Sequence, residues 1–332
     1  MRKWLFGLSL LLLLSLPTLL SYIGGGAICE QMIASKVGMR PTIQSLRFSW
    51  HGPQKLQGIH WNDPEMDGHL TIHAPLWKLF QSAPFEFIFS SNHIQTHMRG
   101  VWSHGTVTLQ EPLTAHIQLT AKLCKEWLKD ANPLFFSAID AKSPITLQLQ
   151  EGSFSLPFSL KNLQAKGTLD MGQVECRSGK YLTAVIHLLK GTPTSTFHAW
   201  FSPLSFHLQD GVVHTGRVDA LLADSIHVCS WGHIDIANDQ IHMFLGIPAA
   251  TLKKSFGIRH LPKNLVLPIP IRGSTRHPEM IKNPTLAKIA ALVSGDQISK
   301  HGFLGQLPEL FLEMQSKESI PEPMRPYPWE HS

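Results

Sequence analysis

The chain lacks the motifs on which most enzymes and metalloproteins depend. Its 332 residues include four cysteines, and none of them forms a CxxC pair of the kind that zinc and redox sites use. The signatures GxSxG, HExxH, GxxxxGK[ST] and GxGxxG are absent as well. We therefore predict that the protein is not an enzyme and has no catalytic residue, cofactor or metal site.

Its acidic residues suggest no catalytic pair. Paired carboxylates such as Asp219 and Asp224 are predicted to lie at strand edges or turns, where solvated carboxylates are expected. Two of the widely spaced cysteines, Cys176 and Cys229, could form a disulfide in an oxidising compartment, although their spacing does not require one.

The charged residues are few and well mixed. There are 29 Lys and Arg residues against 24 Asp and Glu residues, which gives a net charge of +5. They are spread along the chain and form no basic stripe of the kind that nucleic-acid-binding proteins show. We predict no nucleic-acid partner.

One long stretch near the N-terminus carries no charge at all. Arg2 and Lys3 precede an uncharged run from Trp4 to Cys29, and its apolar part, Trp4 to Ile23, is 20 residues long. At 1.5 Å per residue, a helix of that length spans a hydrocarbon core of roughly 30 Å. The basic pair should stay in the cytoplasm, so the rest of the chain should cross the membrane. The alternative is a cleaved signal peptide, for which the small residues at 24–27 offer a processing site.

Beyond this segment, apolar and polar residues alternate with period two, which is typical of strands with one buried face. The expected strands cover 42–50, 54–62, 70–74, 85–90, 101–110, 114–120, 145–150, 164–171, 181–189, 204–209, 211–219, 225–236, 241–246 and 264–271. Helices are expected to about Val37, over 121–130 and over 285–294. The Pro-rich tail, 321–329, is expected to be extended and poorly ordered.

Nineteen histidines raise the question of a metal site. His93, His97 and His104 form the sharpest candidate, because a spacing of four residues brings two ligands together on a helix. The segment is predicted to be extended, however, and a strand would separate His93 from His97 by about 13 Å. Other histidines occupy polar positions of alternating strands, so we interpret them as solvent-facing residues: His69, His73, His116, His227 and His233.

Several local patterns together resemble the AsmA-like family of bacterial envelope proteins, which are related to TamB within the repeating β-groove lipid-transfer proteins. The first patterns are Val37-Gly38-Met39, the segment 43–50 ending in Ser49-Trp50, the segment 52–59, and Asn62-Asp63-Pro64. Further patterns are similar to the C-terminal region of the family, over 208–219, 231–236, 267–274 and Pro278. Between about 90 and 200 the likeness is limited to alternation.

The resemblance implies a mostly β fold: an N-terminal transmembrane helix followed by an extended, curved antiparallel β-sheet groove with a few short helices. The expected domains are an anchor over 1–37, a β-rich body over 38–280 and a C-terminal helical segment with the tail over 281–332. The apolar positions of the alternating strands would line the groove and bind phospholipid acyl chains, namely Leu70, Ile72, Ile145, Leu147, Leu149, Ile226, Val228, Ile234 and Ile236.

The expected role is therefore lipid transfer or outer-membrane biogenesis by a single-pass inner-membrane protein whose body lies in the periplasm. Its partners would be phospholipid, the inner membrane and other envelope proteins. Besides an enzyme of unrecognised type, two alternatives remain open. The strands could close into an ordinary sandwich whose apolar face is covered by protein, and the protein could be a non-catalytic scaffold or assembly factor that binds other proteins.

Overall fold

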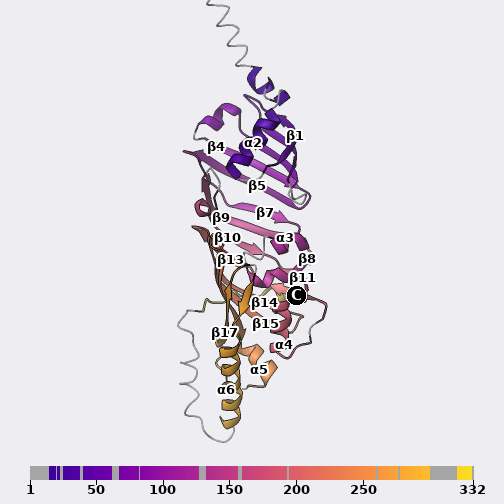
Figure 1. The fold of residues 1–332 in the computed structure, drawn as a ribbon, viewed down its shortest axis with the longest axis vertical. Helices are drawn as coiled ribbons and strands as arrows, with labels where there is room; N and C mark the ends of the chain where they lie inside the picture. The colour runs from indigo at the N-terminus through magenta and orange to yellow at the C-terminus, as the bar shows by residue number, and fades with distance from the viewer. Residues whose placement is uncertain are drawn as a thin grey trace, which may run out of the picture. The chain divides into compact units, whose positions relative to one another are not determined.

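The computed structural model describes residues 15–19, 21–22, 25–37, 40–61, 67–81, 83–126, 132–155, 159–192, 194–258, 261–275, 277–299 and 320–330. The protein is mostly β, with a large antiparallel sheet and a few short helices (Figure 1). The fold class predicted from period-two alternation is confirmed at this level.

The strands are β1 (Thr42–Arg47), β2 (Gln54–His60), β3 (Gly68–His73), β4 (Pro84–Ser91), β5 (Ile94–Ser103), β6 (Thr106–Leu109), β7 (Leu113–Ile117), β8 (Ala138–Ala141), β9 (Ile145–Ser155), β10 (Gln164–Asp170), β11 (Gln173–Arg177), β12 (Thr196–Phe201), β13 (Leu204–Gln209), β14 (Val212–Leu222), β15 (Ile226–Asp235), β16 (Gln240–Pro248), β17 (Val266–Gly273) and β18 (Pro278–Met280). The helices are α2 (Gly25–Val37), α3 (Ala121–Glu126), α4 (Lys180–Leu188), α5 (Ala249–Phe256) and α6 (Asn283–Ser299), with short 3₁₀ turns at η2 (Leu76–Phe80), η4 (Pro133–Ser137), η5 (Leu160–Asn162) and η6 (Pro328–Glu330).

The chain divides into two compact units. Unit 1 contains residues 1–118, 146–167 and 208–210, and unit 2 contains residues 119–145, 168–207 and 211–332. In unit 1, β1 to β5 pair in sequence order as an antiparallel meander, β5 then pairs with both β6 and β7, and β6 pairs with β9. Short connections of this kind are what the turn signals between the alternating runs predict.

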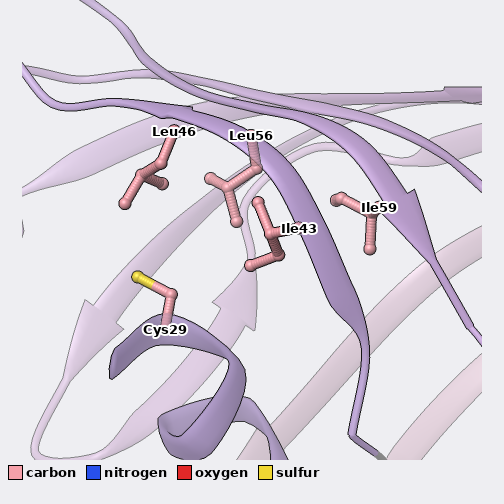
Figure 2. Packing of buried hydrophobic residues seen from close by; sticks show 5 residues of the cluster. All are labelled: Cys29, Ile43, Leu46, Leu56 and Ile59. Carbon is pink, nitrogen blue, oxygen red and sulfur yellow. The ribbon is translucent and has the colours of Figure 1, made fainter. Parts of the chain in front are cut away.

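Helix α2 covers the first strands of unit 1. Figure 2 shows the Cys29 side chain of α2 directed at a cluster of aliphatic side chains on β1 and β2. Ile43, Leu46 and Leu56 are each 7–8% exposed, and Ile59 is 3% exposed. Side chains of the preceding helical residues bond to backbone amides at both ends of β1. Ile43 N–H donates to Glu30 Oε1 (2.9 Å), and Phe48 N–H donates to Ser21 Oγ (2.8 Å).

Unit 2 has a closed hydrophobic core. Its strands pair antiparallel in the order β8, β11, β12, β14, β15, β16, β17 and β18. One cross-strand row joins Val218, Ser230, Leu245 and Ile269, and each of these side chains is 0% exposed. Helix α5 packs against β15 and β16, and α6 packs against β17.

Two of the sequence predictions are wrong in their element type. The segment 181–189, expected as a strand, is helix α4. Its buried residues Leu182, Val185, Ile186 and Leu189 recur at helical intervals, and the β-branched residues masked that period. The expected strand 101–110 is instead a hairpin between β5 and β6. His104 and Gly105 form its two-residue turn with φ of 49° and 80°, the positive values that such turns require.

The predicted transmembrane segment, Trp4 to Ile23, lies largely outside the described residues. Among the residues that the structure does describe, no helix is both long enough and apolar enough to cross a membrane.

Candidate functional site

The strands of unit 1 bring apolar side chains into continuous cross-strand rows on one face of the sheet. One row runs through Leu56, Leu70 and Phe89, and a second runs through Ile72, Phe87 and Met98. Directly opposed residues in antiparallel strands point to the same face. We call this surface the apolar face of unit 1; its further members are Phe85, Trp102, Val107, Leu109, Leu113, Ala115, Ile117, Leu147, Leu149 and Phe154.

The opposite face of the same sheet is polar. His73, Glu86 and Arg99 form one cross-strand row there. The Arg99 guanidinium donates to Glu111 at 2.7 Å, and His97 hydrogen-bonds Glu86. The sheet of unit 1 is therefore amphipathic, as its alternating sequence predicts.

The apolar face of unit 1 is covered unevenly. Under α2 the aliphatic residues are buried, as described above. Away from α2, large side chains pack against the small buried cluster of Met98, Val107, Leu113 and Ala115 but are themselves only partly buried: Phe85, Phe87, Trp102, Leu109, Ile117, Leu147, Leu149 and Phe154. In the described part of unit 1, α2 packs against β1. A contiguous apolar surface that is only partly covered is characteristic of a binding site for an apolar ligand.

The residues predicted to line a lipid groove fall into both units. Leu70, Ile72, Leu147 and Leu149 lie in unit 1 and are partly buried on its apolar face. The other predicted residues lie in unit 2, where Ile145 is 2% exposed, Ile226 is 7% exposed, Val228 and Ile234 are 0% exposed, and Ile236 is partly buried. Their contact with lipid stays a prediction, and the partly accessible members of the set are the four residues of unit 1 and Ile236 of unit 2.

Unit 2 holds a buried polar cluster centred on Asp219. The Arg217 guanidinium donates to both carboxylate oxygens, from Nε to Oδ2 at 2.9 Å and from Nη2 to Oδ1 at 2.8 Å. His227 Nε2 lies 2.8 Å from Oδ1, and the Tyr327 hydroxyl donates to the same oxygen at 3.3 Å. Ser202 Oγ accepts from the Asp219 amide at 2.9 Å.

Asp219 is thus not the solvated acid that the sequence pattern suggests. It lies within β14 and is 0% exposed, whereas Asp224 lies in the following turn and is exposed, as expected. Burial by itself raises the pKa of Asp219, but the hydrogen bonds from His227 and Arg217 outweigh that effect and hold the pKa below its usual value. The carboxylate stays ionised and fully occupied by protein donors. These hydrogen bonds join β14, β15 and the segment that contains Tyr327.

The segment that covers this cluster is the Pro-rich tail. The Tyr327 and Trp329 rings stack with centroids 4.7 Å apart, and His227 meets both rings edge-on. Tyr327 is 4% exposed. Ile320, at the start of the described range 320–330, packs against the buried cluster that contains the stacked Trp231 and Phe244 side chains. The expectation that 321–329 is poorly ordered is therefore wrong, because its aromatic residues pack on the sheet.

The remaining histidine and cysteine predictions have mixed outcomes. His97 lies on strand β5, as the extended conformation predicted for this segment requires, whereas His104 lies in the turn after β5 and not in a strand. His69, His73 and His116 are exposed as predicted, whereas His227 and His233 are partly buried. His233 stacks between His214 and His242 at centroid distances of 5.3 and 5.0 Å, and burial together with these two neighbours lowers its pKa.

The cysteine thiols are buried and form no disulfide in the described part of the chain. Burial raises the pKa of both Cys176 and Cys229 to about 12, which makes these thiols poor nucleophiles. Comparisons of this chain with known protein families, with curated proteins and with solved structures found no match.

Proposed function

We propose that the protein is a membrane-anchored envelope protein that binds phospholipid acyl chains on the apolar face of unit 1 and acts in lipid transfer or outer-membrane biogenesis. The observation that carries this proposal is the uneven cover of that face. Its aromatic and aliphatic side chains continue well beyond α2, and partial burial leaves surface that acyl chains could complete.

The helical residues next to unit 1 support a location at a membrane. Large apolar residues there are exposed: Leu16, Leu19, Tyr22, Ile28 and Met32 are 40–86% exposed. Ile28 and Met32 are four residues apart on α2 and so share one helix face, while Cys29 faces the sheet. A helix that is apolar on both sides fits a position between the sheet and a lipid surface.

The proposal predicts bound lipid on the purified protein. Native mass spectrometry of the full chain, extracted in a mild detergent, should show one or more adducts with phospholipid masses, and chloroform extraction should recover the same lipids. Detergent binding is controlled by repeating the measurement in a second detergent. A protein that carries no lipid under both conditions would favour the alternative role, a scaffold that binds other envelope proteins.

The anchored topology makes a separate prediction. Because Arg2 and Lys3 precede the uncharged segment, a reporter fused after Ser332 should be active outside the cytoplasm and silent inside it. A fusion that also replaces both basic residues with Asp provides the control, and we expect it to lose the orientation bias. Cytoplasmic reporter activity in the unmodified fusion would contradict the orientation, and a mature N-terminus near Ala27 would contradict the anchor.

A further inference from the structure

A cleft of about 1030 Å³ lies in unit 1 between strands β1 and β2 and a set of helical residues, namely Pro17, Thr18, Ser21, Tyr22, Gly26 and Ala27. Apolar residues, including Ile43, Leu46 and Phe48, line part of it. Three basic residues, Arg47, His51 and Lys55, also line it, and its described lining includes no acidic residue. The cleft therefore combines positive charge with an apolar wall.

Two of these basic residues face each other in the sheet. Arg47 on β1 is directly opposite Lys55 on β2, so their side chains leave the same face as near neighbours. Like charges in directly opposed positions are destabilising, and a sheet normally avoids them or places an acid beside them. Here the position that opposes Lys55 on the other side, on β3, is Thr71.

The acidic residues nearby do not compensate this pair. Glu30 accepts the Ile43 amide and lies 3.9 Å from Arg40, and Asp67 accepts from Trp61 N–H and contacts His60 at 2.8 Å. Among the described residues, neither Arg47 nor Lys55 forms an ion pair. Arg47 is exposed and Lys55 is partly buried, and both residues line the cleft.

We infer that this cleft binds a phosphate group, with Arg47 and Lys55 as its ligands and His51 at its margin. A guanidinium and an ammonium held side by side suit a phosphate, since one supplies paired N–H donors and the other a compact charge. The anion would remove the repulsion between them. The inference rests on the proposed function for the source of that phosphate: residues 17–22 belong to the predicted membrane segment, so the cleft opens where lipid headgroups lie.

The test is a titration of the full chain in a non-ionic detergent, by calorimetry, with two probes: dihexanoyl-phosphatidylglycerol and inorganic phosphate. In the double variant Arg47→Gln, Lys55→Gln we expect binding of the lipid probe to weaken at least roughly tenfold. The charge-preserving variant Arg47→Lys, Lys55→Arg should keep most of it. Arg99→Gln removes a basic residue from the same unit outside the cleft and should leave binding unchanged.

Each outcome has a distinct meaning. Binding of the lipid probe that is equal in the unmodified chain and in the double Gln variant would overturn the site. Inorganic phosphate that binds as tightly as the lipid probe, with the same loss in the double Gln variant, would assign the site to the free ion and exclude the headgroup. Measuring co-extracted lipid on the same samples separates this test from the acyl-chain proposal. If only the phosphate site is wrong, lipid is still co-extracted with the protein. If acyl chains do not bind the apolar face of unit 1, no lipid is co-extracted.

Discussion

Replacing Leu147 with Asp should strip bound lipid from the protein and leave it folded, whereas Ile234→Asp should unfold unit 2. Leu147 is partly buried on the apolar face of unit 1, so a carboxylate there can reach water while repelling acyl chains. Ile234 is 0% exposed within a closed core, and an unpaired charge there costs several kcal/mol. That cost is comparable to the whole free energy of unfolding of a typical domain.

Circular dichroism and lipid extraction on the same samples measure the two effects. Gln148→Asp is the matched control, since Gln148 is exposed and adjacent to Leu147 on the other side of β9. It should change neither the fold nor the lipid content. Unfolding of the Leu147→Asp variant, together with an absence of lipid on the unmodified protein, would show that the apolar face of unit 1 is an ordinary protein core.

Asp219→Asn should destabilise unit 2 by about 3 kcal/mol or more. The change leaves the Arg217 guanidinium buried, with a side chain 7% exposed, opposite a neutral amide. Tyr327→Phe removes one hydroxyl donor of the same cluster and should cost only about 1 kcal/mol. Denaturant unfolding followed by circular dichroism gives both values. Asp224→Asn, in the exposed turn after β14, is the control and should be close to neutral.

The Asp219 cluster also predicts a pH dependence. Because the folded protein lowers the pKa of Asp219, its ionisation stabilises the fold above about pH 4 and that contribution is lost as the pH falls through the lowered value. Stability should therefore decline more steeply below pH 4 in the unmodified protein than in Asp219→Asn. Parallel curves for the two proteins would mean that the pKa of Asp219 is the same in the folded and unfolded states.

The sequence predicted which side chains share a face far better than it predicted which faces are covered. Period-two alternation located most strands, including β1, β2, β4, β13, β15 and β17, because cross-strand packing acts on neighbouring residues. It also predicted the same role, lining an apolar groove, for Leu147 and Ile234. Only the fold separates them, since the cover over each residue comes from segments that are remote in sequence.

Asp219 shows the same limit for polar residues. Arg217 and Asp219 alternate with apolar neighbours, which is the pattern of a solvent-facing strand. They are buried because Tyr327 packs over them, and Tyr327 comes from a Pro-rich segment whose composition favours disorder. The one local hint is the pairing of opposite charges two residues apart on a strand, a spacing that keeps both side chains on one face.

The position of Tyr327 in the chain has a consequence for biosynthesis. It follows Asp219 by 108 residues, so strands β14 to β17 are synthesised, and can pair, before the segment that covers the Arg217–Asp219 pair. The ribosome adds about 5–20 residues per second, which leaves an interval of several seconds before the aromatic cover arrives. A product that stops short of Tyr327 lacks the aromatic cover of its charged cluster, and it would be a target for proteases that remove unfinished chains.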